Sequence, residues 1–255
     1  MDNKVLVSDA ADGIIEVKLN RAEKRNAVDF DVIEELEGFL DQYEADKKVR
    51  GLMLTGSGDA AFCSGGDLTA FHSLKTEEES FGMLHRMGKI LYRLAIFPAP
   101  VFALINGTAV GGGCELAMAA DIRLAKKGVR MGFIQGTLSI TTGWGGGSLL
   151  MERVNSSKAL GLLCSANIYG CEELLQKGVL DEILPESFFK EEGLRYVKTM
   201  LAENPAVSRA YKSIQVSKLK QSQLWKRMEE EIWQCAKLWE MEEHHQAVDR
   251  FLKRK

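Results

Sequence analysis

The chain has 255 residues, of which 45% are hydrophobic and 27% charged, and its formal net charge is −3. That composition is typical of a soluble globular protein, and the length allows one large α/β domain or a core with an appendage. Acidic and basic residues are interspersed, so no face of the protein is committed to nucleic acid or to an anionic membrane. We therefore expect neither a nucleic-acid partner nor a membrane partner.

The sequence also bears on cellular location. The N-terminal stretch MDNKVLVSDA lacks the basic end, apolar stretch and cleavage site of a secretory signal. No run approaches the roughly 18 apolar residues that a membrane span needs. Five cysteines without CxxC spacing lie mostly in apolar sequence, which predicts reduced, buried thiols. We expect a cytoplasmic protein.

Strands and helices alternate over roughly the first two thirds of the chain. Residues 5–20 are predicted to form two strands joined by a hairpin turn at Asp12-Gly13. Helical spacing of apolar residues predicts helices over residues 29–48 and 78–97. Short apolar strands are predicted over residues 49–56, 101–107 and 121–125. This alternation is typical of an α/β fold with buried parallel strands.

The pattern becomes almost entirely helical from about Phe188. The stretch QLWKRMEEEIWQCAKLWEMEEHHQAVDRFLKRK is amphipathic and carries more apolar residues than one lone helix needs, so we expect it to pack on the core or on another subunit. We therefore divide the chain into a core over residues 1–190 and a helical C-terminal region over residues 191–255.

Three glycine-rich segments follow predicted strands: FCSGGDL at 62–68, VGGGCE at 110–115 and GWGGGS at 143–148. None contains the Gly-Lys pair of a P-loop, and none has the GxGxxG spacing near a first strand that binds dinucleotides. Gly66 and Gly112 each precede a predicted helix start, where N–H groups are unpaired. Two such N–H groups converging on one oxygen would form an oxyanion hole. The alternative is that these segments are only tight turns and packing points.

Three motifs carry a resemblance to a known family. They are LNRAEKRNAV at 19–28, AFCSGGDL at 61–68 and INGTAVGGGCELAMAADIRLA at 105–125. The chain resembles the crotonase, or enoyl-CoA hydratase/isomerase, superfamily along nearly its full length. The resemblance implies an α/β fold, a crotonase-like spiral of ββα units followed by a helical C-terminal region. It also implies a homotrimer, or a hexamer built as a dimer of trimers.

The resemblance further implies an oxyanion hole made by the N–H groups of Gly66 and Gly112. Other residues would bind an acyl-CoA thioester, with Lys24 and Arg25 near the CoA phosphates. The full substrate-binding set is Lys24, Arg25, Ala27, Ser64, Gly66, Asp67, Leu68, Thr69, Gly112 and Trp144. Coenzyme A would enter only as part of the substrate, and no separate cofactor is expected.

Glu115 matches one of the two glutamates with which hydratases of this family hold and activate water, whereas Gln135 occupies the position of the second. Glutamine does not exchange a proton near neutral pH, so Gln135 would orient a water molecule while Glu115 serves as acid and base. We expect an acyl-CoA lyase that adds water to a 2-enoyl-CoA.

Two alternatives stay open. Decarboxylation of a malonyl-type CoA ester generates the enolate without a general base, and GWGGG is similar to a stretch of ethylmalonyl-CoA decarboxylases. Against this, the Glu115 carboxylate would repel a substrate carboxylate unless it were protonated. The second alternative is a non-catalytic acyl-CoA-binding homologue.

The remaining candidates have weaker sequence support. His72 either donates a proton at the acyl pocket or is an exposed side chain without a role. The other histidines lack metal-ligand spacing, and we expect no metal. Cys63 and Cys114 are predicted to fill the core. The tail of Lys253, Arg254 and Lys255 either reaches the CoA phosphates or is solvated.

Overall fold

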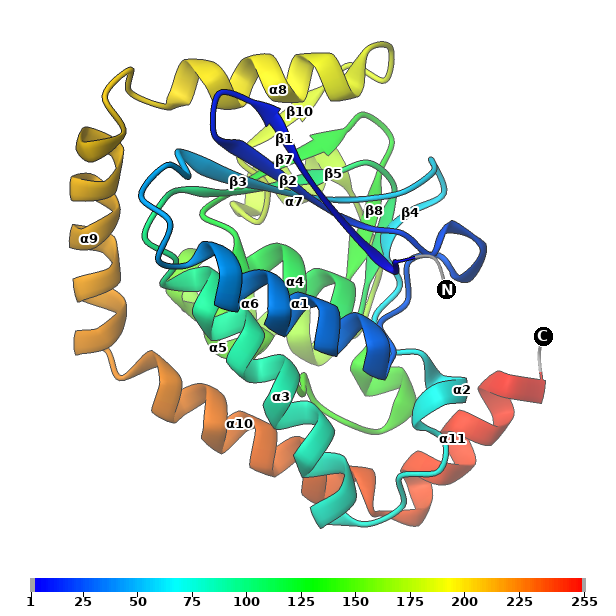
Figure 1. Cartoon of the computed structure of the whole chain (residues 1–255). Helices are drawn as coiled ribbons and strands as arrows, with labels where there is room; N and C mark the ends of the chain where they lie inside the picture. The colour runs from blue at the N-terminus through cyan, green and yellow to red at the C-terminus, as the bar shows by residue number, and fades with distance from the viewer. Residues whose placement is uncertain (1–2, 254–255) are drawn as a thin grey trace.

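The computed structural model describes residues 3–253, and Figure 1 shows helices packed around a twisted sheet. The strand order of this six-stranded sheet is β1-β2-β3-β5-β7-β10. Its strands are β1 (Val5–Ala11), β2 (Ile14–Leu19), β3 (Gly51–Gly56), β5 (Val101–Ile105), β7 (Ile122–Lys126) and β10 (Glu182–Leu184). From β2 to β10 every pair is parallel, as the alternating pattern predicts. Within this sheet of the described chain, β1 and β2 form the one antiparallel pair, joined by the predicted hairpin turn at Asp12 and Gly13.

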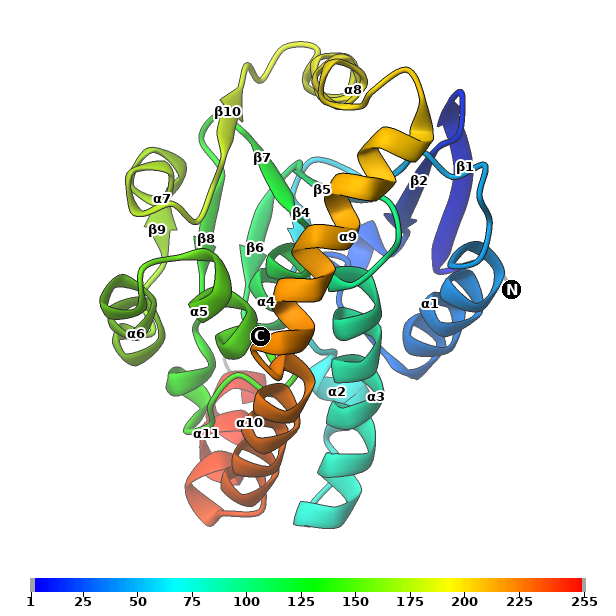
Figure 2. The ribbon, with the colours of Figure 1, turned by 90° about the vertical axis from the view of Figure 1, so that its left-hand side faces the viewer.

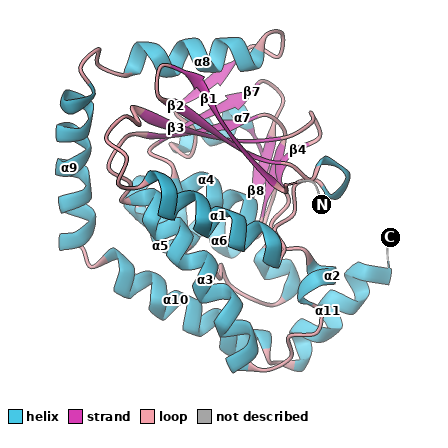
Figure 3. Ribbon diagram, in the orientation of Figure 1, coloured by secondary structure: helices cyan, strands magenta, loops and turns pink. Residues whose placement is uncertain are grey.

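A second, smaller sheet stands beside the first (Figure 3). Its strands are β4 (Ala61–Cys63), β6 (Thr108–Val110), β8 (Arg130–Gly132) and β9 (Tyr169–Gly170). The short lengths of β8 and β9 left no periodic pattern to predict them. A strand of the large sheet, a strand of the small sheet and then a helix follow one another repeatedly along the chain. This repetition produces the spiral of ββα units.

Four helices lie beneath the large sheet: α1 (Phe30–Tyr43), α3 (Glu77–Ala95), α4 (Gly112–Ala119) and α5 (Gly146–Arg153). Of the two whose bounds were predicted, α1 ends five residues before the predicted residue 48. The Asp29 side chain caps α1 by accepting a hydrogen bond from the N–H of Val32, at 3.0 Å. Helix α3 ends two residues earlier than predicted because Pro98 disfavours helical backbone at the residue before it.

Apolar side chains fill both faces of the large sheet. The main core lies between the sheet and α1, α3, α4 and α5. A smaller core on the other face packs Phe102 and Leu104 of β5 against Phe189 and Val197 of α8 (Phe189–Met200). Four of the five cysteines are buried, as predicted, but Cys164 is exposed because it lies on the outer face of α6 (Ser156–Ser165).

The chain after residue 188 is helical, as predicted, and its helices pass from the top of the molecule down one side to the bottom (Figure 2). Helix α7 (Cys171–Lys177) precedes this region. After α8, the region contains α9 (Pro205–Gln221), α10 (Leu224–Trp239) and α11 (Glu242–Lys253). Helix α10 packs on α3 and α5 of its own chain. Its Trp233 is 40% exposed and stacks on Phe81 of α3, with ring centroids 3.9 Å apart. No helix within residues 3–253 is long and apolar enough to cross a membrane.

Candidate active site

The two glycine loops lie side by side because β4 and β6, the strands that lead into them, are neighbours in the small sheet. Gly66 lies between β4 and the short helix α2 (Leu68–Phe71), and Gly112 is the first residue of α4. A Cβ at Gly65 would lie only 2.9 Å from the backbone nitrogen of Gly112. Within residues 3–253, neither the Gly66 nor the Gly112 N–H donates a hydrogen bond. Two unpaired N–H groups therefore stand at adjoining strand–helix junctions.

Glu115 lies one helical turn into α4 and is 2% exposed. Its Oε1 accepts from Gln135 Nε2 at 2.8 Å and from the N–H of Gly143 at 3.3 Å. Its Oε2 accepts from the N–H groups of Trp144 and Gly146 at 2.8 and 2.9 Å.

Burial disfavours the charged form of the Glu115 carboxyl, and the nearby Glu231 carboxylate adds to this effect. Together they outweigh the hydrogen-bond donors and raise the pKa of Glu115 to about 7. A carboxyl group with such a pKa both gives and takes a proton at neutral pH.

Gln135 is brought against Glu115 from a 3₁₀ turn, η2 (Gln135–Leu138). The side chain is 8% exposed, and its Nε2 is the donor to Glu115. Its Oε1 is buried and has no hydrogen-bond partner among the described residues. A buried amide oxygen without a partner is costly in free energy, which makes Gln135 Oε1 a ready acceptor for a ligand or a water molecule.

The Trp144 indole lies against both glycines. A Cβ at Gly112 would lie 2.3 Å from Trp144 Cζ3, and one at Gly66 would lie 3.7 Å from Trp144 Cζ2. Gly112 therefore has a steric reason to be glycine, because any side chain there would meet the ring. Trp144 is 3% exposed and forms a wall next to the two N–H groups.

The predicted CoA-binding residues lie on two segments that run together. Lys24 and Arg25 are exposed, at the end of the turn η1 (Ala22–Lys24). The carbonyl of Arg25 accepts from the N–H of Ser64, at 3.1 Å. Ala27, which follows closely, is buried. These contacts place the basic turn next to the loop that carries Gly66.

Asp67, Leu68 and Thr69 begin the helix after that loop. The Asp67 carboxylate accepts from the N–H of Thr69 at 3.1 Å and from Arg21 Nη2 at 3.1 Å. Asp67 therefore caps α2 and is paired with a cation. Leu68 is half-buried and Thr69 is exposed.

The other candidates lie outside this arrangement. His72 is exposed and lines a small hollow between α2 and α11. Cys63 and Cys114 are fully buried, and burial raises the pKa of the Cys63 thiol to about 12, which agrees with a core-filling role. Within residues 3–253 no cluster of His, Cys, Asp and Glu could hold a metal ion. Arg254 and Lys255 lie outside the described residues.

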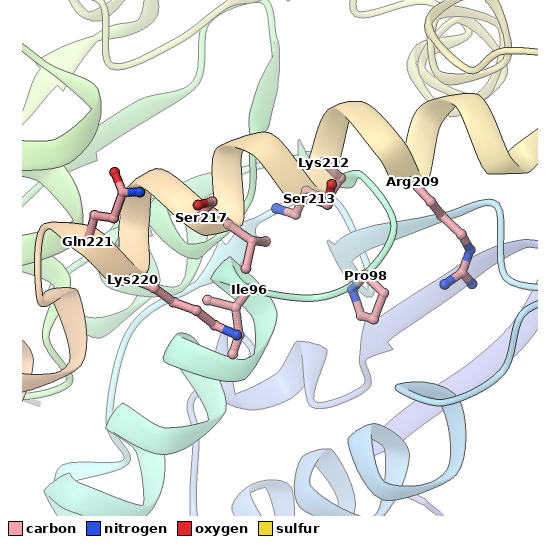
Figure 4. A pocket seen from close by; sticks show the side chains of 9 residues that line it. Ile96, Pro98, Arg209, Lys212, Ser213, Ser217, Lys220 and Gln221 are labelled. Carbon is pink, nitrogen blue, oxygen red and sulfur yellow. The ribbon is translucent and has the colours of Figure 1, made fainter.

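A hollow of about 700 Å³ lies elsewhere, between α9 and the segment after α3 (Figure 4). Ile96 and Pro98 form one side, and Arg209 and Lys220 of α9 line the other. No residue that lines it belongs to the glycine loops or to the surroundings of Glu115. Its size alone does not make it part of this site.

Glu231 of α10 also binds the glycine-rich turn that holds Glu115, although no sequence motif predicts it. Its carboxylate accepts from the N–H of Gly147 at 2.9 Å and from that of Ser148 at 2.7 Å. A motif search had no reason to select this residue. The sequence does place Glu231 between Met228 and Cys235, on the apolar face of an amphipathic helix. A carboxylate on a buried face needs hydrogen-bond partners, and that position could have indicated its role.

Comparison with known proteins agrees with the fold and the motifs. The family described as enoyl-CoA hydratase/isomerase matches residues 9–255. The chain is 34% identical to a short-chain-enoyl-CoA hydratase of Clostridium acetobutylicum over 67% of this chain and 65% of that protein. It is also 34% identical to an ethylmalonyl-CoA decarboxylase of Xenopus tropicalis, over 80% of this chain and 69% of that protein.

Among solved structures, an enoyl-CoA hydratase from Bacillus halodurans superposes with a TM-score of 0.87 at 21% identity. The superposition covers 97% of this chain and 99% of that one, which confirms the predicted fold class. The match over residues 9–255 confirms the resemblance seen in the motifs. The chain belongs to the enoyl-CoA hydratase/isomerase family.

Proposed function

We propose that this protein is an acyl-CoA lyase of the enoyl-CoA hydratase type, which adds water to a 2-enoyl-CoA. The observation that carries this proposal is the buried Glu115 carboxyl, held by Gln135 and three backbone N–H groups. Its pKa, raised to about 7, suits both proton uptake and proton release at neutral pH. The thioester oxygen would lie between the N–H groups of Gly66 and Gly112. Lys24 and Arg25 would bind the CoA phosphates, and Trp144 would wall the acyl group.

The reaction needs one carboxyl group. The Glu115 carboxylate takes a proton from a water molecule while the water oxygen bonds to C3 of the enoyl group. The electron pair of the double bond moves onto the thioester oxygen, where the two glycine N–H groups stabilise the oxyanion. Glu115 then delivers the proton to C2, which restores the carboxylate and completes the addition.

Gln135 serves this step without exchanging a proton. Its Nε2 fixes the Glu115 carboxyl, and its unpaired Oε1 is available to accept a hydrogen bond from the attacking water. The contact from Gly143 to Glu115 Oε1 is the longest of the four, at 3.3 Å. Oε1 therefore has the weakest of the four contacts, and we assign it as the oxygen that takes the proton from water.

A thioester panel tests the proposal. Purified protein is incubated with 2-enoyl-CoA esters of several chain lengths, and the loss of the conjugated thioester absorbance is followed. Hydration adds the mass of one water to the product. If no chain length is turned over while the esters still bind, the hydratase proposal is wrong.

Decarboxylation of a malonyl-type CoA ester is the second candidate, because two observations favour it. Below pH 7 Glu115 is mostly neutral, which removes its repulsion toward a substrate carboxylate. The match to an ethylmalonyl-CoA decarboxylase also covers 69% of the length of that protein. Release of CO₂ from methylmalonyl- or ethylmalonyl-CoA would support this function, and intact ester after long incubation would exclude it.

We also propose a cytoplasmic homotrimer, or a hexamer built as a dimer of trimers, that needs no resident cofactor. Five unpaired cysteines fit a reducing compartment. The outer face of α9 carries apolar side chains that fit a subunit contact: Val207, Tyr211 and Ile214 are 43%, 72% and 67% exposed. Light scattering coupled to size exclusion measures the mass, and a monomer would refute the assembly.

A further inference from the structure

Helix α10 packs closely on the glycine-rich turn that holds Glu115. A Cβ at Gly143 would lie 2.8 Å from the Sγ of Cys235, and one at Gly145 would lie 2.5 Å from Met228 Cε. The side chains at 228, 231 and 235 share one face of α10, since they are spaced by about one helical turn. Because four of the five residues from 143 to 147 are glycines, this face of α10 lies against the backbone of the turn.

Two carboxylates bind successive N–H groups of this turn from different sides. Glu115, from α4, accepts from Trp144 and Gly146. Glu231, from α10, accepts from Gly147 and Ser148, the next two residues of the chain. These N–H groups form the positive N-terminal end of α5, which favours both carboxylates.

We propose that Glu231 is a positioning residue: by holding the N–H groups of Gly147 and Ser148, it fixes the turn that binds the Glu115 carboxyl and sets the Trp144 ring against Gly66 and Gly112. The inference rests on the proposed function for its kinetic consequence. A small displacement of this turn would move the acyl wall and the acid–base group together, and misplacement by about 1 Å costs up to roughly 100-fold in rate.

The charge of Glu231 has a second effect. It is, after burial, the next cause that raises the pKa of Glu115. The titratable groups that face the turn are Glu115 from α4 and Glu231 and Cys235 from α10, and burial raises the pKa of the Cys235 thiol so that it stays neutral. Removing the Glu231 charge therefore lowers the pKa of Glu115.

Two variants of the full chain test the proposal. Glu231→Ala removes both acceptors, and Glu231→Gln keeps one acceptor but removes the charge. Amide hydrogen exchange is measured at residues 144, 146, 147 and 148, and kcat and KM are measured over a range of pH. In Glu231→Ala we expect exchange about tenfold faster or more at all four amides, because loosening spreads through the turn.

The kinetic expectation is a fall in kcat of about tenfold or more for Glu231→Ala, with a smaller change in KM. Glu231→Gln should recover most of kcat, with the limb of the pH profile that reports Glu115 moved to lower pH. Glu230→Gln is the matched control, because Glu230 is an exposed neighbour on α10 whose carboxylate faces Lys226 at 4.0 Å. It should behave like the wild type.

Faster exchange confined to residues 147 and 148, with exchange at residues 144 and 146 unchanged, would overturn the proposal by showing that Glu231 only caps α5. So would a wild-type kcat and pH profile in both variants. If the protein turned over no thioester, the hydrogen exchange would still decide whether Glu231 fixes the turn, and the failure would belong to the proposed function alone.

Discussion

Replacing Glu115 by glutamine should change how stability depends on pH. In the folded protein the pKa of Glu115 is raised to about 7 from an ordinary value of 4.5, mainly because the carboxyl is buried. Between these values the folded protein holds a proton that the unfolded chain has released. The free energy of unfolding therefore decreases as the pH rises through this window. A difference of about 2.5 pKa units corresponds to about 3 kcal/mol.

The glutamine should be accommodated in the same place. Its Oε1 replaces Glu115 Oε2 as acceptor from Trp144 and Gly146. Its Nε2 then faces Gln135, whose amide rotates so that the unpaired Oε1 accepts from it. Glu115→Gln thus resembles the protonated glutamate. Because it has no proton to release, the folded variant is not destabilised by ionisation at this position as the pH rises.

Urea unfolding of both proteins between pH 4.5 and pH 8 measures the effect. The difference in unfolding free energy, variant minus wild type, should grow by about 3 kcal/mol across this range, because titrations common to both proteins cancel. The variant should also lose hydration activity by about 100-fold or more, since amides do not exchange protons. Parallel stability curves for the two proteins would refute the assignment of a raised pKa to Glu115.

Three further predictions follow from the same site. Gly112→Ala should place a methyl group against the Trp144 indole and lower activity about 100-fold by displacing an oxyanion donor, with a folded protein confirmed by circular dichroism. Trp144→Ala should lower the free energy of unfolding, measured with urea, by about 3–5 kcal/mol and shift the substrate preference toward bulkier acyl groups. An unchanged chain-length preference would show that Trp144 does not wall the acyl group. Gln135→Glu should place a second carboxyl group where the Gln135 amide nitrogen now lies, 2.8 Å from Glu115 Oε1, and raise the rate of hydration about tenfold or more. An equal or lower rate would show that the lack of a second carboxyl group does not limit hydration.

The sequence by itself determined the family and the class of fold, and it predicted most residues of the candidate site. Strand–helix junctions with glycine, and a helix that starts at Gly112, are local features that short motifs encode completely. The same is true of the hairpin at Asp12 and Gly13 and of the parallel strands, whose continuous apolar runs indicate burial on both faces. Alignment of motifs also predicted that Gln135 occupies the position of a second glutamate.

Only the tertiary structure decided how these groups act on one another. Glu231 binds an N–H group 84 residues away in the chain, and no local pattern records that contact. The pKa of Glu115 depends on how completely α4, α5 and α10 exclude water, and the position of Trp144 depends on α10 pressing against the glycine turn. The burial and close packing of a residue depend on contacts from segments that are distant in sequence. For that physical reason, only the folded structure determines them.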